Sequence, residues 1–186
     1  MARDTLARTL HDAGLAAWFG GSLMGAVGLN AAAGVVDDPR QAGRVANEGW
    51  DRWTPVNALA IGAHLAGAAM ILATNSKRVA GQKGVGTTAL VKTGLTVSAL
   101  GVTAYSRMQG RKLSAVRDVP ASAGATPHPQ TPSDLAAAQS KLHALQYAVP
   151  AVTGALVVVS ALAGEQQRPS EVSKGMAQRV TSLVSH

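Results

Sequence analysis

The feature that most constrains this chain is a long uncharged stretch near its N-terminal end. No Asp, Glu, Lys or Arg occurs between Asp12 and Asp37, and the stretch consists mainly of Gly, Ala, Leu and Val. An α-helix of about 20 apolar residues is long enough to cross the hydrocarbon core of a bilayer. The stretch therefore predicts a membrane-spanning helix, and the rest of the sequence has to be interpreted with lipid as a solvent.

Three further stretches have the same character. The chain has 17 Lys and Arg residues and 10 Asp and Glu residues. Only one of them, Lys92, lies in the four windows 13–36, 53–76, 84–106 and 142–164. A water-soluble bundle needs a polar face on every helix, whereas helices that are apolar all round belong in lipid. We therefore predict an all-α integral membrane bundle of four transmembrane helices, with spans at about 14–36, 55–74, 85–105 and 142–164.

The segments around the spans complete the predicted organisation. Residues 1–164 form the transmembrane domain, with residues 1–12 as an interfacial lead-in, and residues 165–186 form a polar tail with an amphipathic pattern. Segment 118–133 is rich in Pro, Ala, Ser and Thr, so no regular structure is expected there. The fourth helix is expected to begin at Ser133 or Asp134, ahead of its span, and to kink at Pro150.

The first connector predicts a short helix lying on the membrane surface. Asp38 followed by Pro39 is typical of a helix start, and Thr54 followed by Pro55 indicates that a new helix begins there. Trp50 and Trp53 are three residues apart and share one side of the connector helix. Because Trp is enriched at membrane interfaces, we interpret both as interface anchors, with an aromatic ligand site as the alternative.

Small residues indicate faces where helices can pack closely. Gly21, Gly25 and Gly28 share one side of the first span, and Gly94 and Gly101 share one side of the third. Small residues let two helix backbones approach each other in lipid, where burial gives little driving force. These faces are either docking surfaces for a partner subunit or packing surfaces within the chain.

Two ionisable residues inside the spans are candidates for a functional polar site, because such residues are costly in a membrane. His64 lies near the middle of the second span, where it would relay protons or contact a polar ligand. Lys92 lies about two turns into the third span, from where it can extend toward the basic connector of Lys77, Arg78 and Lys83. The alternative for His64 is a hydrogen bond to another helix, with Asn30, Thr96, Ser98 and Tyr147 as the candidate partners.

Other functions find little support in the sequence. The formal net charge is +7, but the basic residues lie in connectors beside apolar spans, which is typical of lipid headgroup contacts and not of nucleic-acid binding. The chain has no Cys, its five His residues are far apart, and it contains no phosphate-binding loop or catalytic motif. We therefore expect no enzyme activity, no cofactor and no metal.

The distribution of basic residues gives a weak preference for orientation. Four spans place both termini on one side, and the two sides carry equal numbers of Lys and Arg. The shortest connector, 75–84, is purely basic, and short loops govern orientation. We therefore predict a multi-pass protein of the inner (plasma) membrane with both termini in the cytoplasm.

Two segments carry a resemblance to known proteins. The segment from His11 to Asn30 and the segment from Gly49 to Asn57 resemble small four-helix membrane proteins of mycobacteria and related actinobacteria. Within that group the chain resembles the accessory membrane subunit associated with the MCE lipid-import machinery.

The resemblance implies a non-catalytic accessory or stabilising subunit, with membrane lipids and other integral membrane subunits as partners. The alternatives are a small membrane carrier or enzyme centred on His64, and a soluble helical binding module.

Overall fold

The computed structural model describes residues 4–76, 84–116, 118–166, 168 and 172, and they form a helical bundle with one small hairpin. Its elements are α1 (Thr5–Met24), a π-helical turn (Gly25–Leu29), α2 (Asn30–Ala33), α3 (Pro39–Thr74), α5 (Val85–Ser114), β1 (Ala121–Ala123), β2 (Thr126–Pro127) and α6 (Ser133–Glu165). The predicted all-α fold is confirmed. Four helices among the described residues are long and apolar enough to cross a membrane: Thr5–Ala33, α3, α5 and α6.

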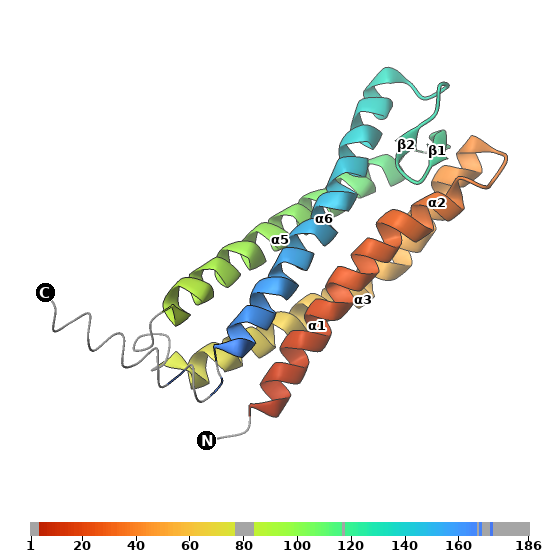
Figure 1. Cartoon of the computed structure of the whole chain (residues 1–186). Helices are drawn as coiled ribbons and strands as arrows, with labels where there is room; N and C mark the ends of the chain where they lie inside the picture. Colours follow the sequence, from red (N-terminus) through yellow and green to blue (C-terminus); the bar gives the residue numbers. More distant parts are fainter. Residues whose placement is uncertain (1–3, 77–83, 117, 167, 169–171, 173–186) are drawn as a thin grey trace, which may run out of the picture.

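The first helix begins earlier than the sequence predicts. Residues 5–12, expected to form an interfacial lead-in, are the first two turns of α1, because Ala7 and His11 are buried against Gly67 of α3. At the other end, the helix widens into the π-helical turn, where the Asn30 N–H bonds to the carbonyl of Gly25, five residues back. The helix then continues as α2 in the same direction (Figure 1).

The predicted interfacial helix after the first span is wrong. Asp38 does cap a helix, since its carboxylate accepts the N–H of Arg40 at 2.9 Å, but that helix continues through Pro55 to Thr74. A proline removes only one hydrogen bond of the ladder. The Thr54 hydroxyl, expected to cap a new helix, instead donates to the Trp50 carbonyl at 2.8 Å. Trp50 packs against Gly25 of α1 before the proline, and Ala60 and His64 lie against Gly14 of α1 after it, so the helix is held on both sides of Pro55.

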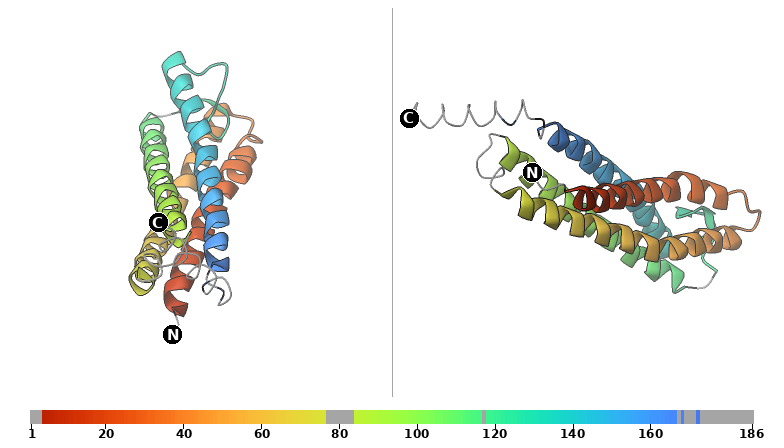
Figure 2. Two further views of the ribbon diagram at one scale, coloured as in Figure 1. Left: turned by 60° about the vertical axis from the view of Figure 1, so that its left-hand side comes forward. Right: turned by 90° about the horizontal axis from the view of Figure 1, so that it is seen from below.

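The long helices associate as two antiparallel pairs. α1 packs along α3, and α5 packs along α6, while α6 also contacts α1 and therefore lies between α5 and α1 (Figure 1). α3 and α5 barely touch. The main core cluster, Trp18, Ala99 and Val149, joins α1, α5 and α6. The hairpin lies at one end of the bundle and the N-terminus at the other (Figures 1 and 2).

The Pro-rich connector contains more structure than expected. Ala121–Ala123 pairs antiparallel with Thr126–Pro127 across a turn in which Gly124 has a φ of 52°, a conformation that favours glycine. The Pro120 carbonyl accepts hydrogen bonds from the side chains of Thr131 (2.8 Å) and Gln139 (2.9 Å). These polar contacts fix the hairpin onto α6, which begins at Ser133 as predicted.

Two predictions lie outside the described residues. One is the amphipathic pattern of the tail, of which the structure describes only residues 165, 166, 168 and 172. The other is the basic connector of Lys77, Arg78 and Lys83.

Close backbone contacts define how α1 lies against α3. Gly67 faces His11, Gly14 faces Ala60 and His64, and Gly25 faces Trp50. The same register places residues 25–33, the last turns of the first span, beside the first third of α3, which carries charged residues. It also brings His11, near the start of α1, to the level of His64, which lies in the second half of α3.

Candidate functional site

A groove runs between α3 and α5, the two long helices that barely touch. It contains two cavities, an upper one of about 300 Å³ toward the hairpin and a lower one of about 350 Å³ toward the opposite end. Leu100 lines both cavities. Ligand pockets are typically mainly apolar with a few polar groups that fix orientation, and both cavities have this character. We take this groove as the candidate functional site.

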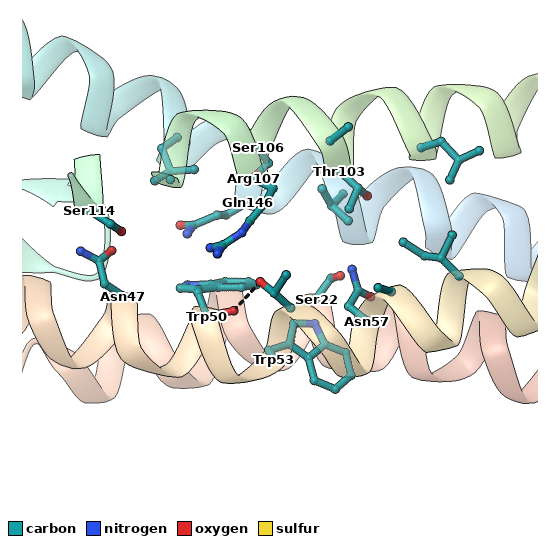
Figure 3. Close-up of a pocket in the computed structure, with 18 residues that line it drawn as sticks. Ser22, Asn47, Trp50, Trp53, Asn57, Thr103, Ser106, Arg107, Ser114 and Gln146 are labelled. Atoms are coloured by element: carbon teal, nitrogen blue, oxygen red, sulfur yellow. Dashed lines mark hydrogen bonds between the residues drawn. The ribbon is translucent and has the colours of Figure 1, made fainter. Parts of the chain in front are cut away.

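Polar side chains of three helices meet in the upper cavity (Figure 3). Arg107 and Gln146 point from α5 and α6 toward the ring of Trp50 on α3. The Trp50 indole N–H donates to Asn30 Oδ1 at 3.0 Å, and Asn30 Nδ2 donates to Gln146 Oε1 at 2.9 Å. Arg107 forms an ion pair of 2.7 Å with Asp51, which links α5 to α3. The cation of the upper cavity is therefore already neutralised within the chain.

Two further polar atoms of the upper cavity have no hydrogen-bond partner among the described residues. They are the indole Nε1 of Trp53 and the side-chain Oδ1 of Asn57, both buried and four residues apart on α3. Buried polar groups normally have a partner, and an unsatisfied one costs about 1–3 kcal/mol. One donor and one acceptor are thus available to a molecule in the cavity.

His64, the first predicted polar residue, lies in the lower cavity at 1 % exposure. Its Nδ1 lies 3.2 Å from the backbone carbonyl of His11, and the two imidazole rings are 4.4 Å apart. A carbonyl only accepts, so Nδ1 carries the proton and donates. None of the four side chains expected as partners of His64 forms a hydrogen bond with it, because the register of α1 brings His11 to this level instead.

Lys92, the second predicted residue, lies beside the same pair. Its Nζ is 3.2 Å from His11 Nε2, and His11 Nδ1 is 2.7 Å from a carboxylate oxygen of Asp12. An ammonium only donates, so Nε2 of His11 accepts and its Nδ1 donates to Asp12. The expectation that Lys92 extends toward the basic connector is therefore corrected: its contact is inside the bundle.

The five predicted glycines have three different surroundings in the structure. Gly21 and Gly25 lie directly against the rings of Trp53 and Trp50, so this face packs within the chain. Gly28 lies beside the side chain of Met24, one turn earlier in the same helix. Gly94 and Gly101 have open space where a side chain would project. Trp50 and Trp53 are consequently packing residues of the α1–α3 pair, on a continuous helix and not on a surface helix.

Comparisons with models of protein families, with curated proteins and with solved structures give no match. The resemblance noted from the sequence therefore stays a prediction.

His11 is the main site residue that sequence reasoning missed. It precedes the uncharged stretch and lies in the segment predicted to be an interfacial lead-in. A signal was present, since Ala7, His11, Gly14 and Trp18 recur with helical spacing and form the buried side of α1.

Proposed function

We propose that the protein is an integral membrane protein that serves as a non-catalytic accessory subunit of a larger membrane complex. Membrane placement is supported by long charge-free segments in two of the helices. α3 has no charged residue between Arg52 and Asn75, and α6 has none between Lys141 and Glu165. At 1.5 Å per residue each segment is about 33 Å long, close to the thickness of a hydrocarbon core.

The single observation that carries the accessory role is the outer face of α5, which we define as Leu90, Gly94, Val97, Gly101 and Met108. Leu90 and Val97 are 75 % and 63 % exposed, and both glycines face open space. In the whole of α5 only Ala99, Gln109 and Leu113 are buried. Large apolar side chains beside glycines on a transmembrane helix favour close approach of another helix, because small residues allow backbone contact.

The complex that the resemblance suggests is an MCE-type lipid importer, in the inner membrane and with both termini of this chain in the cytoplasm. The test is purification of the tagged protein from its native membrane in mild detergent, with identification of co-purifying subunits. We expect a defined partner that is lost in Gly94→Leu and Gly101→Leu. Gly62→Leu is the matched control, since Gly62 also faces open space but lies on α3.

Recovery of monomer or homodimer alone, or equal recovery of the partner by all three variants, would overturn the proposal. Gly25→Leu is unsuitable for this test, because Gly25 packs against Trp50 and the substitution would disturb the fold itself.

A second candidate function, a small carrier centred on His64, is favoured by the contact of His64 with His11 and of His11 with Lys92. Ionisable residues in membrane spans often mark transport or proton pathways. His64→Gln, which keeps a polar side chain of similar size, should abolish a transport function while the protein still accumulates in the membrane. Unchanged cellular function of that variant would remove this candidate.

A further inference from the structure

The lower cavity combines apolar walls with one charged side chain. Of the described residues that line it, only Lys92 is charged, and no carboxylate is among them. Its walls are formed mainly by apolar side chains of α3 and α5: Leu65, Ala68, Leu72, Ala89, Val97 and Leu100. A cavity of this composition favours a ligand with an anionic or acidic group and an apolar body.

Two of the polar side chains that line this cavity, Lys92 and His64, complement each other as donor and acceptor. Lys92 uses one N–H on His11, and its ammonium group has two more to donate. His64 donates through Nδ1, which leaves a lone pair on Nε2, and this atom is buried without a hydrogen-bond partner among the described residues. The cavity therefore offers donors on one side chain and an acceptor on another.

A carboxylic acid satisfies both side chains at once. One oxygen accepts from Lys92, and the other shares a proton with Nε2 of His64. The hydrogen bond to His64 exists whether the carboxyl group or the imidazole holds that proton. An ester accepts from Lys92 but has no proton to share with His64, and an amine would place a second cation beside Lys92.

The groove also has room for a long apolar chain. Leu100 separates the lower cavity from the upper one, whose walls include Ala58, Ile61, Ala104 and Val149. From Lys92 to Thr103 the groove extends about 16 Å along α5. Because α3 and α5 barely touch, the groove is open along its side. Each cavity has the size of a small-ligand site. A helix with its side chains is about 10 Å across, so a small molecule suits these cavities better than a helix of a partner protein.

We propose that this groove binds a single-chain amphiphile with a carboxylic acid head, the head at Lys92 and His64 and the chain along Leu100 toward Trp50 and Trp53. The inference does not rest on the docking face of α5, which shares only Val97 with the residues that line the two cavities of the groove.

The test uses the native tryptophans as reporters. Trp50 and Trp53 line the upper cavity and Trp18 lies beside His64, at 6.1 Å between rings, and these are the three tryptophans of the chain. Dibromostearic acid, whose bromine atoms quench indole fluorescence on contact, is titrated into the full-length protein in nanodiscs of zwitterionic lipid. We expect saturable quenching that unbrominated stearic acid reverses.

Two ligand controls separate the head from the chain. The methyl ester of dibromostearic acid should bind at least tenfold more weakly, because it lacks the acid. Acetate should fail to displace the brominated acid, because it lacks the chain. Equal quenching by the ester would mean nonspecific filling of an apolar groove, and displacement by acetate would mean a small-anion site; either result overturns the proposal.

Variants localise the head. Lys92→Met should weaken binding at least tenfold, Lys92→Arg should restore it to within about threefold, and Lys112→Met is the matched control on the exposed side of α5. If Lys92→Met does not fold, Leu100→Phe tests the chain path, and it should reduce quenching without removing the Lys92 head site. Unchanged binding in Lys92→Met, or in Leu100→Phe if Lys92→Met does not fold, would refute the proposed position of the ligand.

Discussion

At Gly14 and Gly67 the backbones of α1 and α3 lie so close that neither position has room for a side chain. A Cβ added to Gly14 would lie 2.5 Å from the Ala60 carbonyl oxygen and 2.6 Å from the His64 amide nitrogen. Backbone atoms cannot move aside as a flexible side chain can. The two helices would have to separate, and the His11–His64 contact would be lost with them.

We therefore expect Gly14→Ala to destabilise the protein by about 1–3 kcal/mol, the usual cost of overpacking. Thermal unfolding of the purified protein in detergent measures the effect. Gly20→Ala, on the same helix but in open space, should leave the midpoint unchanged or slightly raised. Equal midpoints for the two variants would show that α1 and α3 are farther apart than described.

Asn30 is the centre of a buried side-chain network that joins three helices. It accepts from Trp50 of α3 and donates to Gln146 of α6. Asn30→Ala should cost about 1–3 kcal/mol, because it leaves buried polar groups on both neighbours without a partner. Gln146→Ala should cost a similar amount, and the double variant less than the two combined. Denaturant unfolding of the four proteins gives the coupling; strict additivity would contradict the network.

The number of long helices could be predicted from the sequence, but the residues at which they begin and end could not. Four helices follow directly from four stretches that contain a single charged residue, Lys92, because only an apolar solvent or core suits such stretches. The continuation of α3 through Pro55 could not be predicted, since each half is held against α1 by glycines more than 20 residues away. Trp50 and Trp53 of the first half lie against Gly25 and Gly21. In the second half, Ala60 and His64 lie against Gly14. The start of α1 is different, because the helical spacing of Ala7, His11, Gly14 and Trp18 indicates it, whereas the partner that buries His11, Gly67, is visible only in the structure.

The register of α1 against α3 also predicts which parts of these helices meet water. Residues 25–33 lie beside the charged start of α3, so this end of both helices should project beyond the hydrocarbon core. The native chain has no Cys, which allows single cysteines to be introduced. Because maleimides react with the thiolate, which forms in water, Val27→Cys and Val45→Cys should label readily in intact membranes permeable to the reagent.

Leu59→Cys and Val97→Cys are the matched controls, since both positions are at least as exposed on the surface of the bundle. Leu59 lies in the charge-free segment of α3, and Val97 lies between Lys92 and Arg107 of α5, where no residue is charged. They should label only after solubilisation in denaturant. Rapid labelling of Leu59→Cys in membranes would indicate that the charge-free segment of α3 is not in lipid.

The groove is a property of how the two helix pairs meet, and the sequence contains little information about that. Helices that are apolar on every side have no polar face to indicate which neighbour they contact. The pairing is decided by shape, through Gly14 and Gly67 on one side and the Trp18 cluster on the other. His64 and Lys92 were predicted individually, but their meeting through His11 depends on this pairing.

The contact of α6 with the other helices should be sensitive to substitution of its buried residues. Leu156 of α6 is fully buried, whereas Leu162 on the same helix is 58 % exposed. Leu156→Ala should lower stability by about 2–5 kcal/mol, as expected for a cavity in a packed core. Leu162→Ala should change it by less than about 0.5 kcal/mol. Similar losses in the two variants would place Leu156 outside the packed interior.

The π-helical turn at Gly25–Leu29 has a consequence for the length of this helix. A π-helical turn is equivalent to an α-helix with one residue inserted. The turn accommodates the extra residue, so the helical segments before and after it keep the same side toward the bundle. Deletion of a single residue between Gly25 and Leu29 would convert the turn to regular α-helix and leave Trp18 and Asn30 on their present sides. A deletion elsewhere in α1 would rotate everything beyond it by about 100°. This turn is thus where natural variants of the chain should differ in length.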